Sequence, residues 1–420
     1  MADIPLTPLT GDALQERFQA LDAFLLAHQA LWRPRPFVDL HLPWEAHYPE
    51  LATWLRGRTL QQAEADHNAP HALIAPAPFT ELATTAQALS AIGGLPSITT
   101  PEPMERQVVD VPGRKWQQIE AFASRLNFCN ATVHWLDWCA GKGHLGRRLI
   151  QPGQQLTCLE YDPALVQAGQ QQSQRLTIAA HHRLQDVLDD SAAEHLHAEQ
   201  TPVALHACGD LHVRLLQLAS AKGCRQLAVA PCCYNRIRTP AYQALSLQAQ
   251  QSALELSLDD LRLPLSETVT AGQRQRQQRD LSMARRLGFD LLQRHARNTD
   301  EYLPTPSLPV SWLHKSFADY CHHLAELKGF SLPANQDWDA VQAHGWQRLA
   351  EVRNLELLRN LFRRPLEVWL LLDRALYLQE HGYSVSLGTF CDYQITPRNL
   401  LLLAELLHHI RYGFSRLRQP

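Results

Sequence analysis

The sequence predicts an α/β protein built on a doubly wound, mostly parallel sheet, with helical additions at the N-terminal and C-terminal ends. From Trp116 onward, short apolar runs alternate with helical stretches, which is typical of successive βαβ units. A glycine-rich turn follows the first apolar run. The chain has 420 residues, of which 45% are hydrophobic and 19% charged, and this composition excludes a disordered or fibrous chain.

The alternation predicts five strands and four intervening helices. The strands are expected over 133–138, 156–161, 182–184, 203–207 and 227–230, and the helices over 146–150, 164–174, 192–197 and 213–222. Helical periodicity over 14–32, 44–55 and 79–92 predicts a helical N-terminal region, residues 1–105. Residues 106–420 are then expected to form the main domain, with helical insertions and a C-terminal extension.

The C-terminal part of the sequence is mostly helical in pattern. Apolar periodicity predicts helices over 313–327 and 355–380, and a short strand pair is expected near 383–392. Thr396 as a cap and Pro397 at the first helical position predict one more helix.

Charge and composition narrow the possible partners. With 39 basic and 42 acidic residues the net charge is −3, so a nucleic-acid partner would need a local basic patch. One arginine cluster could bind RNA phosphates or an acidic protein face, or could equally be a solvated helix face. Its members are Arg274, Arg276, Arg279, Arg285 and Arg286. No apolar run approaches the ~20 residues that span a bilayer, so no membrane association is expected.

The cysteines and the N-terminus predict a cytoplasmic protein. The nine cysteines are odd in number and scattered, unlike a disulfide framework. Residues 1–10 have neither the basic nor the apolar segment of a signal peptide.

The glycine turn predicts a nucleotide or nucleoside site. Gly141, Gly143 and Gly146 satisfy the G-x-G-x-x-G pattern, in which glycines let the backbone approach a ligand. The pattern alone also fits a nicotinamide cofactor. However, Asp137 lies four residues before Gly141, where a carboxylate can orient the turn or meet a ligand's ammonium group. A pyrophosphate would be repelled there, so the acid favours S-adenosylmethionine.

Two further acids follow the next two predicted strands. Glu160 is placed to accept hydrogen bonds from both ribose hydroxyls of a nucleoside, and Asp186 to accept one from the exocyclic amine of adenine. Each acid by itself could be a surface residue of a turn. Because the carboxyl ends of parallel strands share one edge, all three acids are expected to lie together.

The fourth and fifth predicted strands end in polar and nucleophilic residues. His206 and Asp210 follow the fourth, and Cys232, Cys233 and Tyr234 follow the fifth. Cys139, Cys208, Cys232, Cys233 and His206 could together bind zinc, but no C-x-x-C pair is present and adjacent cysteines are not expected to point at one ion. We therefore predict no metal. The cysteines could be buried apolar fillers or include a catalytic thiolate.

Four blocks of sequence carry a resemblance to a known family. They are 136–146 (LDWCAGKGHLG), 206–211 (HACGDL), 231–234 (PCCY) and a distal block, 370–380 with 396–399. The chain resembles the class I S-adenosylmethionine-dependent methyltransferases and, within them, the group of methyltransferase-like protein twenty-five. The resemblance implies a Rossmann-like fold with S-adenosylmethionine as cofactor.

Site residues follow from the resemblance and the strand ends together. The cofactor-binding set is Asp137, Cys139, Ala140, Gly141, Gly143, His144, Leu145, Glu160, Asp186, Val187 and His206, and the catalytic set is Asp210, Cys232, Cys233 and Tyr234. Cys139 stands where the superfamily usually has its first glycine. Gln117 and Gln118 replace the ionisable pair of the family's entry motif, which argues against acid/base chemistry there.

Three functions fit the sequence. The first is a methyltransferase acting on RNA or on a translation-associated protein, which would hold an acceptor atom about 3–3.5 Å from the reactive methyl. In that reaction Asp210, His206 or Tyr234 could orient the acceptor or take its proton. The second is a non-catalytic S-adenosylmethionine-binding scaffold, and the third a nicotinamide-dependent oxidoreductase.

Overall fold

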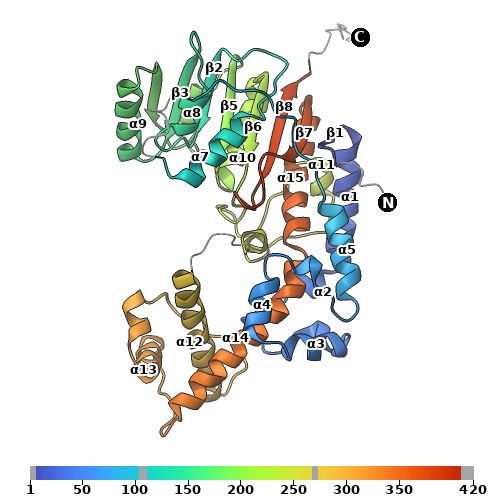
Figure 1. The fold of residues 1–420 in the computed structure, drawn as a ribbon, viewed down its shortest axis with the longest axis vertical. Coiled ribbons are helices and arrows are strands. Elements are labelled where there is room, and N and C mark those ends of the chain that lie inside the picture. The colour runs from blue at the N-terminus through green and yellow to red at the C-terminus, as the bar shows by residue number, and fades with distance from the viewer. Residues whose placement is uncertain (1–5, 104–110, 267–272, 408–420) are drawn as a thin grey trace, which may run out of the picture. The chain divides into compact units, whose positions relative to one another are not determined.

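The computed structural model describes residues 6–103, 111–266 and 273–407. Among these residues, eight strands form one sheet in the order β1-β7-β8-β6-β5-β2-β3-β4 (Figure 1). The strands are β1 Leu9–Thr10, β2 His134–Trp138, β3 Gln155–Glu160, β4 Ala180–Leu184, β5 Gln200–Leu205, β6 Gln226–Ala230, β7 Tyr383–Thr389 and β8 Leu400–Leu406. The predicted doubly wound α/β fold is confirmed.

The five predicted strands are β2 to β6, and they pair in parallel. From β2 the chain moves outward through β3 and β4, then returns to the other side of β2 through β5 and β6. β2 and β5 are therefore the neighbours at which the strand order reverses. In open α/β sheets ligands bind at this switch point, outside the carboxyl ends of the strands.

The helix predicted from Thr396 and Pro397 is wrong. The chain instead forms β8, which pairs antiparallel with both β6 and β7. Its first five residues are all buried, because a strand inside the sheet is covered on both faces. That burial explains the uninterrupted apolar run Leu400–Leu403, which has no helical period. The short strand pair expected near 383–392 is β7, paired with β8 rather than within its own range.

The described residues also form helices, some of which connect and cover the strands. They are α1 Asp12–Ala27, α2 Gln29–Trp32, α3 Pro49–Arg56, α4 Leu60–Asp66, α5 Phe79–Ser90, α7 Gly113–Ala123, α8 His144–Leu149, α9 Pro163–Arg175, α10 Asp210–Lys222, α11 Leu247–Gln250, α12 Gln273–Arg297, α13 Phe317–Lys328, α14 Trp338–Asn360 and α15 Arg363–Glu380. The expected helix 192–197 is a short 3-10 turn, Asp190–His195. The expected helix 355–380 is broken at Leu361 and Phe362, between α14 and α15.

The chain divides into two compact units, each made of separate segments. Unit 1 comprises residues 1–23, 91–264 and 367–420, and unit 2 comprises residues 24–90 and 265–366. The predicted division at residue 105 stays a prediction. In unit 1, α7 and α8 pack over the sheet around a core that includes Phe122, Trp135, Leu156 and Phe390.

Unit 2 is helical. Its two longest helices, α12 and α14, contact one another closely at Gly288 and Gly345. A Cβ atom on Gly345 would lie 2.5 Å from the carbonyl oxygen of Ala284, so only glycine permits this approach. Phe289 and Leu292 of α12 also pack against residues of α13 such as Tyr320. No helix in the described parts of either unit is long and apolar enough to cross a membrane.

Candidate active site

The glycine turn lies directly after β2, at the switch point. The backbone N–H of Gly143 donates to the carbonyl oxygen of Ala140 (2.9 Å), which closes the turn before α8 begins. Cys139, Gly141 and Gly143 all have positive φ angles (57°, 58° and 74°), a conformation in which glycine is unstrained. Cys139 adopts it without being glycine, where the superfamily's usual first glycine would stand.

Asp137 orients this turn through a buried hydrogen bond to the first turn of α8. Its side chain is 2% exposed, and its Oδ2 accepts a hydrogen bond from the backbone N–H of Gly146 (2.9 Å). Gly146 packs so closely that a Cβ atom there would lie 2.5 Å from Cδ1 of Leu156. Of the two roles expected for Asp137, the structure supports the orientation of the turn.

Burial of Asp137 predicts a pH-dependent stability. Desolvation raises the pKa of Asp137 from its ordinary value of 3.8 to about 6, although the Gly146 hydrogen bond and the charge of Arg147 oppose this shift. The folded chain then holds the proton more tightly than the unfolded chain, so the contribution of Asp137 to the free energy of unfolding falls as the pH rises through this interval. Asp137→Asn removes that dependence.

We expect the free energy of unfolding of Asp137→Asn, relative to wild type, to rise by about 2 kcal/mol between about pH 4 and pH 7. Urea denaturation of both proteins at intermediate pH values measures this difference. Parallel pH dependences of the two proteins would contradict the prediction.

Glu160, at the end of β3, contacts the glycine turn directly. Its Oε2 accepts from the backbone N–H of Gly141 (2.8 Å), and its Oε1 accepts from those of Tyr161 and Asp162 (both 3.0 Å). The carboxylate therefore has a fixed position between the turn and the next loop. Two of the three acids predicted to share the sheet edge, Asp137 and Glu160, are thus tied to the same turn.

A cavity of about 350 Å³ opens at this edge. It is lined by Cys139, Glu160, Tyr161, Gln185, Asp186, Val187 and Leu211. Four of these were predicted, namely Cys139, Glu160, Asp186 and Val187. Tyr161, Gln185 and Leu211 were missed, although each directly adjoins an acid that was singled out.

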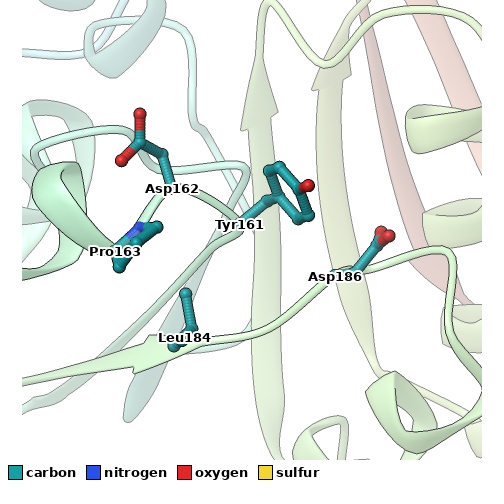
Figure 2. A pocket seen from close by; sticks show the side chains of 5 residues that line it. All are labelled: Tyr161, Asp162, Pro163, Leu184 and Asp186. Carbon is teal, nitrogen blue, oxygen red and sulfur yellow. The ribbon is translucent and has the colours of Figure 1, made fainter.

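A second cavity, of about 550 Å³, shares Tyr161 and Asp186 with the first (Figure 2). Asp162, Pro163 and Leu184 complete its lining. Tyr161 is 71% exposed and Leu184 60% exposed, so apolar surface is open to solvent at this edge of the sheet. Burying such surface against a planar ring would be favourable.

Some predicted cofactor residues lie away from these two cavities. His144 is buried at the start of α8 within 3.2 Å of the Arg147 guanidinium, and burial lowers its pKa to about 3. Leu145 belongs to the core of unit 1. His206 has a positive φ of 71° and a hydrogen bond to the side chain of Gln118. Burial lowers the pKa of His206 as well.

The loops after β5 and β6 are joined by backbone hydrogen bonds. Gly209 N–H donates to the carbonyl oxygen of Cys233 (2.8 Å), and Asp210 N–H to that of Arg236 (3.0 Å). A Cβ atom on Gly209 would lie 2.0 Å from the Arg236 oxygen, so this contact requires glycine. The Asp210 carboxylate accepts from the backbone N–H of Arg238 (2.7 Å), which fixes the second loop over the first.

Tyr234 has the contacts of a core side chain. It is fully buried, its ring meets the ring of His212 edge-on at 6.2 Å, and the Arg374 guanidinium lies 5.3 Å from its ring centre. The catalytic role predicted for Tyr234 stays a prediction, and these contacts support a structural role instead.

Arg374 connects the distal block to both loops. Its Nε donates to His212 Nε2 (2.7 Å), and its Nη1 donates to the Tyr242 hydroxyl (3.0 Å). His212 is held in the neutral form that can accept, since burial and Arg374 lower its pKa and its Nδ1 bonds the carbonyl oxygen of Ala207 (2.9 Å). The Tyr242 hydroxyl in turn donates to Asp373.

The cysteine loops depart from our expectation. Sγ of Cys208 lies 3.3 Å from Sγ of Cys232, and the sulfurs of Cys232 and Cys233 lie 3.7 Å apart. All three sulfurs are within 4.8 Å of one another. The expectation that the adjacent Cys232 and Cys233 do not point at one place is therefore wrong, because the turn after β6 directs both toward Cys208.

The arginine cluster of α12 is only partly exposed. Arg274 and Arg276 are exposed, whereas Arg285 is 7% exposed and donates to the carbonyl oxygens of Trp312 (3.0 Å) and Lys315 (2.9 Å). Within unit 2, a cavity of about 240 Å³ has Arg279 and Arg286 in its lining together with two aromatic side chains, Trp312 and Tyr320.

One comparison with known proteins matches the part of the chain that carries these residues. Residues 114–240, which span β2 to β6 and the loops described above, match the family model of a methyltransferase domain. A structure of coclaurine N-methyltransferase bound to N-methylheliamine and SAH aligns over 82% of this chain and 90% of its own, at 13% identity. Its TM-score of 0.25 is too low to support a conclusion about this chain.

The sheet, its switch point and the matched domain define a class I methyltransferase fold. The chain is an S-adenosylmethionine-dependent methyltransferase, and S-adenosylmethionine is its cofactor.

Proposed function

We propose that this methyltransferase transfers a methyl group to a macromolecular acceptor, with RNA favoured over a translation-associated protein. We further propose that it is related to the group of methyltransferase-like protein twenty-five. The observation that supports this relationship is the meeting of three resemblance blocks in one network. Arg374 of the distal block bonds His212 beside the HACGDL block and lies over the ring of Tyr234 in the PCCY block.

The cavity beside the glycine turn suits the nucleoside part of the cofactor. Glu160 offers two carboxylate oxygens for ribose hydroxyls, as such acids do at this position of doubly wound sheets. Tyr161, Val187 and Leu211 offer apolar surface for the adenine, and Asp186 an acceptor for its amine. We therefore assign the predicted cofactor-binding residues in this cavity to direct contact.

The remaining predicted cofactor residues have a different task. Asp137 holds Gly146, and His144 and Leu145 are buried in the first turn of α8. They position the turn rather than line the cavity.

The main task of this chain in the reaction is to position the acceptor atom next to the methyl group of the cofactor. S-adenosylmethionine, when bound, supplies an electrophilic methyl group. Asp210 is held by the backbone N–H of Arg238 beside the cysteine loop, where it can orient an acceptor or receive its proton. The partly buried His206 has a pKa lowered by desolvation and is therefore neutral near pH 7, so it can accept a hydrogen bond. Cys232 and Cys233 lie at the same edge.

Unit 2 supports the preference for RNA. Guanidinium groups and aromatic rings are the groups that bind phosphates and stack on bases, and Arg279, Arg286, Trp312 and Tyr320 bring both to one cavity. Arg274 and Arg276 extend the positive charge along the exposed side of α12. An RNA acceptor also accords with a cytoplasmic location, which we propose because all nine cysteines are free thiols.

Transfer of a labelled methyl group to fractionated cell RNA and protein tests this proposal. We expect label in the RNA fraction that is lost on ribonuclease treatment and withstands protease. Label that withstands ribonuclease and is lost on protease treatment would overturn the preference for RNA. Binding of the cofactor without transfer to either fraction would favour the scaffold function, and affinity for NAD would favour the oxidoreductase.

A further inference from the structure

The thiols of Cys208, Cys232 and Cys233 form one cluster of sulfur atoms. The cluster joins two separate loops at the switch-point edge, and backbone hydrogen bonds such as Gly209 N–H to Cys233 O (2.8 Å) fix these loops against each other. All three side chains are partly buried, so the sulfurs are held by the fold and still reachable from solvent.

The spacing of the sulfurs matches a shared metal ion. Zinc binds thiolate sulfur at about 2.3 Å, so two sulfurs on one tetrahedral zinc lie about 3.8 Å apart. The separations between Cys232 and its two partners are 3.3 and 3.7 Å, and the remaining pair is within 4.8 Å. Adjustments of at most about 1 Å, within the reach of rotations about χ1, would place all three around one ion.

We propose that Cys208, Cys232 and Cys233 bind one thiophilic divalent cation, with Zn²⁺ as the natural candidate, through three thiolates. The fourth position of a tetrahedral ion is left to solvent or to an exogenous ligand. Among the described residues this is the only group of three or more potential ligands that converges in this way.

Charge at the site favours such a complex. A dication with three thiolates carries a net charge of −1, and the positive charges of Arg236 and Arg398 act on this cluster. Binding of the ion as three thiolates displaces the thiol protons.

Cobalt substitution provides the test on the full chain. With all nine thiols reduced and confirmed by titration with a thiol reagent, Co²⁺ is added without oxygen and the sulfur-to-cobalt charge-transfer absorption is recorded. We expect saturation at one equivalent and bleaching by one equivalent of Zn²⁺. Cys208→Ser should weaken Co²⁺ binding at least about 100-fold, because losing a ligand exceeds the roughly 10- to 100-fold loss typical of an outer-sphere change.

Cys391→Ser is the matched control, since Cys391 is also a partly buried free thiol but lies outside the cluster. It should bind Co²⁺ like the wild type. Circular dichroism and S-adenosylmethionine affinity of Cys208→Ser report that it is folded. Absence of the absorption in the fully reduced wild type, or equal binding by folded Cys208→Ser, would overturn the proposal. So would a Cys208–Cys232 disulfide that persists in the presence of reductant, because it would remove two ligands.

Discussion

Replacement of Arg374 by methionine is expected to lower the free energy of unfolding by about 3–5 kcal/mol, as is usual when one partner of a buried charge network is removed. Arg374 is 1% exposed and Asp373 fully buried. Without Arg374, His212 Nε2 loses its donor, and the Asp373 carboxylate loses the cation that reaches it through Tyr242. Urea denaturation of both proteins measures the loss.

Two variants make this prediction sharper. Arg374→Lys keeps the charge but not the fork that reaches His212 and Tyr242 together, so it should lie between wild type and Arg374→Met. Arg225→Met removes an exposed arginine of the same unit and should change the free energy of unfolding by no more than about 0.5 kcal/mol. A loss below about 1 kcal/mol for Arg374→Met would show that the network is not a stabilising centre.

The sequence was sufficient to predict the strands β2 to β6, where short apolar runs alternate with helical stretches. Those strands are short apolar runs bounded by turn residues, and the structure places each within a few residues of its predicted range. It was insufficient for β8, because Thr396 and Pro397 mimic a helix start. Only pairing with β6 and β7 fixes that segment as a strand. β6 lies more than a hundred residues away in the sequence, and β7 about ten.

Prediction of the site had a similar limit. The order of the strands along the chain predicted that Glu160 and Asp186 lie at one edge of the sheet. In the structure Glu160 bonds the glycine turn, and both acids line the cavity beside it. The strand order could not show on which side of the glycine turn each side chain lies. Asp137 and His144 are close in sequence to Cys139, yet they are buried behind the turn, whereas Cys139 faces the cavity.

The cysteine and tyrosine positions show the same limit at the next loop. Cys232, Cys233 and Tyr234 are consecutive, but the two thiols turn toward Cys208 while the tyrosine ring enters the core beneath Arg374. Sequence spacing does not carry this information, because backbone geometry after β6 decides it. The distal sequence block could have indicated that Tyr234 is buried, because Arg374 of that block supplies the cation over the tyrosine ring.

Replacement of Glu160 by alanine is expected to weaken S-adenosylmethionine binding about 100-fold or more, equivalent to about 3 kcal/mol. Hydrogen bonds to a charged group contribute about 1.5–3 kcal/mol each, and we propose that this carboxylate accepts two from the ribose. Its loss also frees the backbone N–H groups of Gly141, Tyr161 and Asp162 that it now fixes. Calorimetric titration with the cofactor measures the change.

Glu160→Gln separates the two contributions. The amide keeps one acceptor oxygen, which can still bind Gly141, but has no negative charge and replaces the second acceptor by a donor. We expect it to bind the cofactor more weakly than wild type and more tightly than Glu160→Ala. Asp190→Ala, which removes a fully exposed acid of the same unit, should leave the affinity unchanged. Because Glu160 lines the cavity and bonds the backbone of Gly141, wild-type affinity in Glu160→Ala would place the cofactor elsewhere.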